Sequence, residues 1–324
     1  MGNEFLFRGQ RVTQDEVHSR KEFFDFMSSL QLKPPFIVKP NWISADYGHF
    51  TDPQILEWTL RFLDRAGEAV LVESYSVRNT MSLPDFKPGQ VLSEAERKRL
   101  RESEEDYLRR TGTRRVLDEL GIEYVNVAEE FLEGRTVNRE IVKDAVERKY
   151  PSVLRGELYS FVPEKLYELR RGTFISLAKF KLFFTMCTKN MFGLIPEYVG
   201  YGERLEAYHG EAYKDLAQNI IDVNKVYRSI FHVVGLVEGV NSLTYNMHAK
   251  DAKYKAAFGY RYDVLEDKGL IYYGDDLSWL DAFIHQQCGK TPHKEPHLSL
   301  AAQTFGEWPP ELIAEAKRAG NPLR

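Results

Sequence analysis

The sequence predicts an α/β protein with a mainly parallel central sheet flanked by helices and a charged helical insertion. Short apolar runs rich in strand formers alternate with amphipathic helical patterns along most of the 324 residues, as in chains built from strand–helix–strand units. Such units form right-handed crossovers that leave the two strands parallel. No Pro/Ser-rich linker or internal repeat divides the chain. We therefore expect a single α/β domain over 1–324, with two lobes as an open alternative.

The first predicted element is a helix over 13–30, opened by a capping box at Thr13. The clearest strand–helix–strand unit follows, from a strand at 36–38 through a helix to a strand at 69–72. Pro53 suits the first turn of that helix, because the N–H that proline lacks would have no helical partner there. These segments predict two parallel strands joined by a crossover helix.

A strongly charged helix follows the second strand. Ser93 and Glu96 form a capping box that opens it, and its charged pattern continues to Arg110. This helix belongs to a predicted insertion over 84–121. Three roles are open for it: a plain surface helix, a lid over a cleft, or a docking surface. Further strands are predicted at 122–127, 173–177, 231–237 and 270–273, and further helices at 114–120, 212–227, 278–287 and 310–318.

Composition excludes several classes of protein. The chain has 44 Lys+Arg against 48 Asp+Glu, a net charge of −4, so it has no bulk attraction to nucleic acid or to anionic membranes. A hydrophobic content of 43% excludes a disordered chain. No apolar run approaches the roughly 18 residues of a membrane span, and no export signal opens the chain. We expect a cytoplasmic protein, and its oligomeric state is left open.

Candidate functional residues follow from a rule of topology. In open α/β sheets, ligands bind beyond the carboxyl ends of the parallel strands. The candidate ligand-binding residues at these ends are Lys39, Asn41, Lys179, Lys181, Lys189, Asn190, Gly193 and Gly239. The candidates for moving protons, and therefore for catalysis, are His209, Glu238 and Asp276.

Three lysines lie in an otherwise apolar setting within the segment 178–193. Burying an unpaired ammonium is costly, so these side chains must pair with carboxylates, reach water along the sheet edge or bind an anionic ligand. The lysines expected to bind an anion are Lys39, Lys179, Lys181 and Lys189. On this hypothesis, Lys179→Met abolishes stabilisation by the anion without destabilising the unliganded protein. Lysine binds both phosphate and carboxylate as a point charge, so these residues do not indicate which of the two anions the ligand carries.

The order of several motifs resembles a known family. VKPNW near the first strand, TDP before a helix, KFK…TKNMFGLIP, VVGLVEG and YGDDLSWLDAF occur in sequence from about Phe36 to about Leu298. This pattern resembles the domain-of-unknown-function family numbered 362, and the resemblance implies an α/β fold and a candidate site but no settled reaction. The positions that match the family's features are Lys39, Asn41, Lys179, Lys181, Lys189, Asn190, Gly193, Glu238, Gly239, Asp276 and Asp281.

Metal and cofactor signals are weak. Many relatives carry a four-cysteine ferredoxin-like segment, but Cys187 and Cys288 are the only cysteines here, so we expect no protein-bound four-cysteine iron–sulfur cluster. His293 and His297 have zinc-pair spacing, yet adjacent prolines argue against a helix there, and no metal site is expected. The Asp275–Asp276 pair is compatible with a divalent cation beside a phosphate ligand. Otherwise the cofactor is unknown.

The sequence thus predicts an uncharacterised protein that binds or transforms a small anionic metabolite, bearing phosphate or carboxylate, in a cleft at the strand carboxyl ends. Whether it is an enzyme is left open. One alternative is a non-catalytic ligand-binding or partner-docking protein. Another, which rests on the resemblance alone, is a redox protein that works with a separate ferredoxin.

Overall fold

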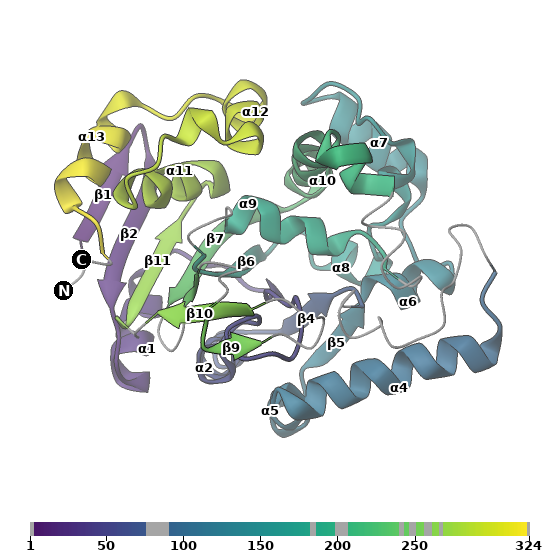
Figure 1. Ribbon diagram of the computed structural model, residues 1–324. Helices are drawn as coiled ribbons and strands as arrows, with labels where there is room; N and C mark the ends of the chain where they lie inside the picture. The colour runs from purple at the N-terminus through teal and green to yellow at the C-terminus, as the bar shows by residue number, and fades with distance from the viewer. Residues whose placement is uncertain are drawn as a thin grey trace.

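The computed structural model describes residues 3–75, 91–181, 186–197, 207–239, 243–245, 251–255, 261–265 and 268–322. An eight-stranded sheet forms its centre, in the order β1-β2-β11-β7-β6-β3-β4-β5 (Figure 1). The strands are β1 (Asn3–Phe7), β2 (Gln10–Glu16), β3 (Phe36–Lys39), β4 (Ala69–Glu73), β5 (Glu123–Asn126), β6 (Thr173–Lys179), β7 (His232–Gly239) and β11 (Leu270–Gly274). Five neighbours, β7, β6, β3, β4 and β5, run parallel. The predicted α/β class with a mainly parallel sheet is confirmed.

Helices cover both faces of this sheet (Figure 1). The helices are α1 (Arg20–Ser29), α2 (Pro53–Asp64), α4 (Glu94–Arg110), α5 (Thr113–Leu120), α6 (Val127–Leu132), α7 (Arg139–Glu147), α8 (Glu164–Glu168), α9 (Cys187–Asn190), α10 (Leu216–Ile230), α11 (Leu277–Gln287), α12 (Pro296–Phe305) and α13 (Pro310–Ala319). Side chains from α7 and α9 to α13 share one buried cluster with one face of the sheet, and those of α1, α2, α4 and α5 share another with the opposite face. None of these described helices is long and apolar enough to cross a membrane.

The predicted N-terminal helix over 13–30 is wrong in its first half. Residues 10–16 form β2, which pairs with β1 on one side and with β11 on the other. Arg8 and Gly9 have positive φ angles of 47° and 81° and make the tight turn between β1 and β2. Thr13 lies inside the strand, and Ser19 instead caps α1 by accepting a hydrogen bond from Glu22 N. Strand pairing on both sides outweighs the local capping signal at Thr13.

The last predicted strand runs in the direction opposite to its neighbour. β11 pairs antiparallel with β7, so that Gly274 lies opposite Gly235 and Leu270 opposite Gly239. A small three-stranded sheet of β8 (Leu243–Tyr245), β9 (Tyr254–Lys255) and β10 (Arg261–Leu265) lies between β7 and β11 in the chain. Among the described residues between β7 and β11 there is no helix, and the chain returns antiparallel. Residues after β11 therefore lie at the amino edge of the parallel strands.

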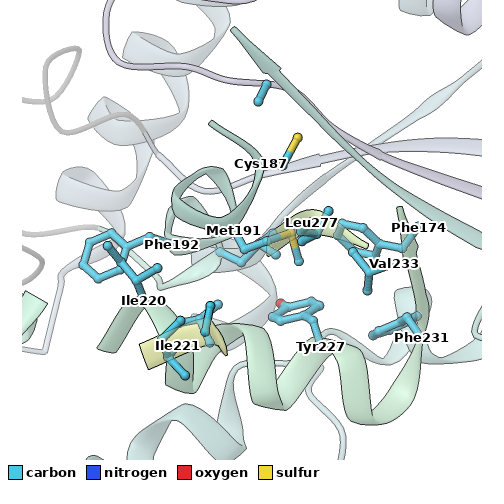
Figure 2. Close-up of a cluster of buried hydrophobic side chains, with 14 of the residues drawn as sticks. Phe174, Cys187, Met191, Phe192, Ile220, Ile221, Tyr227, Phe231, Val233 and Leu277 are labelled. Atoms are coloured by element: carbon cyan, nitrogen blue, oxygen red, sulfur yellow. The ribbon is translucent and has the colours of Figure 1, made fainter. Parts of the chain in front are cut away.

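The core on the α9–α10 side positions the segment that carries the predicted lysines. Figure 2 shows Met191 and Tyr227 between the sheet and α10, close to Phe174 of β6. The Phe174 and Tyr227 rings meet edge to face with centroids 5.6 Å apart. Asp281 of α11 accepts hydrogen bonds from the backbone N–H groups of Cys187 (2.9 Å) and of Thr188. This packing holds α9 over the carboxyl end of β6.

A helix also forms where the prolines were expected to prevent one. Pro296 occupies the first turn of α12, the helix position that tolerates proline. His297 lies in α12 while His293 precedes it, and the ring of His297 lies 3.1 Å from a carboxylate oxygen of Glu295. Within the described part of the chain, no group of three or more His, Cys, Asp or Glu residues has metal-binding geometry.

Candidate functional site

Lys39, the last residue of β3, is buried at the carboxyl edge of the parallel strands. Its Nζ donates to Glu73 Oε2 at 2.5 Å, to the Pro40 carbonyl at 2.8 Å and to Asn190 Oδ1 at 3.1 Å. The register places Lys39 beside Ser176 of β6, so both side chains lie on the face covered by α9. The three donors of this ammonium therefore all have acceptors inside the protein.

Asn190 and Gly193 fix the surroundings of this ion pair. The Asn190 amide donates to the Lys39 carbonyl and to Ser176 Oγ, both at 3.1 Å, and so joins α9 to two strands. A Cβ atom at Gly193 would lie 2.6 Å from Lys39 Nζ and 2.7 Å from Glu73 Oε1. A side chain at position 193 would therefore have to displace the ion pair from the space it fills.

A second buried ion pair joins β6 to β7. Lys179 lies opposite Glu238, and its Nζ donates to Glu238 Oε1 at 2.9 Å, with both side chains 0% exposed. The same oxygen accepts from the backbone N–H of Asp52, the residue that caps α2. Oε2 of Glu238 has no hydrogen-bond partner in the described structure. Burial raises the pKa of Glu238, although Lys179 opposes the rise.

Lys181 lies just beyond β6 and is only 6% exposed. Its Nζ donates to Asn41 Oδ1 at 3.0 Å. Asn41 is itself held by Thr51, whose Oγ1 accepts its backbone N–H at 2.8 Å, and by the His49 carbonyl, which accepts its side-chain amide. Burial lowers the pKa of Lys181 well below its usual value, and the nearby ammonium groups of Lys189, Lys179 and Lys39 lower it further.

Lys189 of α9 completes the group of lysines. Burial lowers its pKa to about 8, while Glu295 opposes the shift. The lysine cluster, defined as Lys39, Lys179, Lys181 and Lys189, thus combines four basic groups with the two paired carboxylates of Glu73 and Glu238. Within these six side chains, basic groups outnumber acidic ones.

Some predicted site residues lie elsewhere. Asp276 was expected at the same edge as the lysines, and this is wrong because β11 is antiparallel. Its carboxylate caps α11 through Ser278 N and pairs with Arg228. Burial by itself would raise the pKa of Asp276, but Arg228 and these hydrogen bonds hold it below its usual value. Asp276 is an anchor for α11 at the opposite edge of the sheet.

The remaining candidates are Gly239 and His209. Gly239 ends β7 opposite Leu270. His209 packs edge to face against the rings of Phe192, at 5.2 Å between centroids, and Tyr213. Residues 182–185 of the lysine-bearing segment lie outside the described residues.

Sequence reasoning left Glu73 out of the site although it pairs with Lys39. The signal for Glu73 was present in the sequence, because it directly follows the predicted strand at 69–72 just as Lys39 follows the predicted strand at 36–38. Adjacent parallel strands bring such ends together. Asp281, which matched the family pattern, positions α9 rather than contacting the lysines directly. Burial raises the pKa of Asp281 to about 6.

A polar pocket of about 240 Å³ lies beyond the carboxyl ends of β4 and β5. Tyr75 and Tyr124 line it, and their hydroxyls donate at 2.5 Å to Glu129 and Glu104 respectively. α4 forms one wall and is tied to α6 by Arg97, whose guanidinium pairs with Glu129 at 3.0 Å. The predicted charged helix is thus packed against the strand ends, and its role as a lid or docking surface stays a prediction.

Comparison with known proteins gives a family match. The family model described as "Domain of unknown function (DUF362)" matches residues 37–285, a range that contains the whole lysine cluster. No curated protein and no solved structure matches the chain. Because the family model covers most of its length, the chain belongs to the DUF362 family.

Proposed function

We propose that this protein binds a small anionic metabolite, bearing phosphate or carboxylate, at the lysine cluster. The observation that carries the proposal is the state of Lys181. This side chain is 6% exposed, and its hydrogen bond goes to a neutral amide, Asn41 Oδ1, rather than to a carboxylate. The carboxylates of the cluster, Glu73 and Glu238, pair with other lysines.

Electrostatics explains why an anion fits here. Lost hydration destabilises the charged forms of Lys181 and Lys189, and repulsion by the neighbouring lysines adds to this at Lys181, as the lowered pKa values of both groups indicate. A bound phosphate or carboxylate favours the protonated lysines and relieves both effects. Lysine binds such groups as a point charge, so the arrangement admits either anion.

Glu238 is the group best suited to move a proton at this site. Its Oε2 has no hydrogen-bond partner in the described structure, and burial raises its pKa above the usual value. It also acts electrostatically on Lys181. His209 keeps a proton-transfer role only as a prediction.

Thermal unfolding with inorganic phosphate and simple carboxylates tests anion binding. An anion at a hundredfold excess over its dissociation constant stabilises the native state by about 2.7 kcal/mol. Lys181→Met keeps most of the apolar stem and removes the amine, so most of the increase in melting temperature should disappear. Lys214→Met, which changes an exposed lysine, is the matched control and should keep it. A wild-type protein that no phosphate or carboxylate stabilises would falsify the proposal.

A further inference from the structure

Lys181 differs from the other lysines of the cluster in its bonding. All three donors of Lys39 have acceptors, and Lys179 pairs with a carboxylate at 2.9 Å. Lys181 has a single hydrogen bond to Asn41 Oδ1, and no described carboxylate forms an ion pair with it. Lys181 therefore lacks the carboxylate partner that Lys39 and Lys179 have, and it keeps N–H groups and a nitrogen that a ligand can engage.

Such an amine is suited to nucleophilic chemistry. A lysine becomes a nucleophile when burial or a neighbouring cation favours its neutral form. Both conditions hold at Lys181, whose pKa is lowered by burial first and then by Lys189, Lys179 and Lys39. A neutral amine also satisfies the geometry, since it can still donate to Asn41.

We propose that Lys181 forms a Schiff base with an anionic aldehyde or ketone, so that the metabolite bound at the lysine cluster is an oxo acid or a phosphorylated carbonyl compound. This inference rests on the proposed anion site and names its substrate class. In this arrangement Lys189 binds the phosphate or carboxylate of the substrate, and Lys181 Nζ attacks its carbonyl carbon.

The step balances without an oxidant or reductant. The Lys181 lone pair forms the C–N bond while the carbonyl π pair moves to oxygen, and transfer of one proton from nitrogen to that oxygen gives a carbinolamine. Glu238 in its protonated form then gives a proton to the hydroxyl group, which leaves as water as nitrogen forms the C=N bond. The resulting iminium returns its proton to Glu238 to give the imine. One amine and one carbonyl thus yield one imine and one water.

Reductive trapping tests this step directly. The protein is incubated with glyoxylate or glycolaldehyde phosphate and sodium borohydride, then digested and mapped by mass spectrometry. The expected result is a reduced adduct on Lys181 in the wild type and in the surface control Lys214→Arg. In Lys181→Arg the adduct disappears, because a guanidinium does not form an imine. Lys181→Met gives the same readout if the arginine variant does not fold.

The outcomes separate this inference from the anion site. Lys181→Arg keeps a cation, so stabilisation by inorganic phosphate should persist while trapping is lost. If phosphate stabilises the wild type but no adduct forms on Lys181, the Schiff base is overturned and anion binding stands. An adduct found mainly on Lys189 or on exposed lysines also overturns it. If neither phosphate stabilisation nor an adduct is observed, both proposals fail.

Discussion

At the scale of single residues, the lysine cluster contains two kinds of lysine. Lys39 and Lys179 are paired with carboxylates inside the protein, whereas Lys181 bonds to an amide. A buried ion pair offers little net stability compared with apolar residues, yet breaking one side is costly because a charge remains buried. The ion pairs of Lys39 and Lys179 therefore have a structural role, and of the lysines expected to bind an anion, Lys181 is the one that the proposed function relies on most.

Lys179→Met should destabilise the unliganded protein by about 3–5 kcal/mol, because it leaves the Glu238 carboxylate buried without its cation. This reverses the expectation drawn from the sequence. Chemical denaturation near neutral pH measures the loss. The double variant Lys179→Met/Glu238→Leu should recover much of it, since both charges are then absent. Lys21→Met, which breaks an exposed pair with Asp25, should leave stability nearly unchanged. An equally small effect for Lys179→Met would argue against a structural ion pair.

At the scale of elements, α9 has only four residues and depends on tertiary contacts for its position. Asp281 of α11 accepts the two backbone N–H groups at its start, Cys187 N and Thr188 N. Because α9 carries Lys189 and Asn190, this contact couples α11 to the lysine cluster. The position of the long charged helix α4 likewise depends on tertiary contacts, namely its ion pairs with Glu129 of α6.

Asp281→Ala should cost about 2–6 kcal/mol in unfolding free energy, since it leaves two buried N–H groups without acceptors at about 1–3 kcal/mol each. It should also weaken stabilisation by phosphate, because Lys189 and Asn190 lose their support. The matched control is Asn138→Ala, which removes the N-cap of α7, a helix that carries no residue of the lysine cluster. It should lower the unfolding free energy by about 1 kcal/mol. That variant should keep the phosphate effect. An Asp281→Ala protein no less stable than Asn138→Ala would contradict the anchoring role.

At the scale of the whole molecule, a chain with a net charge of −4 concentrates four lysines at one sheet edge. Lys189 has its folded pKa lowered from 10.5 to about 8 by burial. Folding therefore disfavours its charged form, a cost that is full below pH 8 and is relieved as pH rises toward 10.5. On the proposed function, a bound anion reverses this preference, because it binds the protonated form of Lys189.

Stabilisation by phosphate should therefore decrease as pH rises through about 8, with proton uptake on binding above that pH. Thermal unfolding with and without phosphate across this pH range measures the change, and calorimetry in buffers of different ionisation enthalpy measures the uptake. Lys189→Met should flatten the pH dependence. Phosphate stabilisation that grows above pH 8 would exclude Lys189 as a cation of the site.

The sequence by itself determined which segments become the parallel strands and, to within one or two residues, where those strands end. All of the predicted strands are present, as β3, β4, β5, β6, β7 and β11. Lys39 and Lys179 were recognised as strand-end residues because apolar runs and helix caps are local signals that neighbouring residues carry. These local signals did not reveal the β1–β2 hairpin. The capping pattern at Thr13 is also a local signal, and it predicted a helix where pairing with β1 and β11 makes a strand.

Only the tertiary structure decided which partners these residues have. Lys39 and Glu73 are 34 residues apart, Lys179 and Glu238 are 59 apart, and Lys181 and Asn41 are 140 apart. The direction of β11 is likewise a matter of long-range pairing, with β7 and β2, and that direction places Asp276 away from the lysine cluster. Pairings of this kind depend on strand order and register, which long-range packing selects and no window of neighbouring residues records. The sequence could therefore place lysines at one edge, but only the fold could distinguish the paired Lys179 from Lys181.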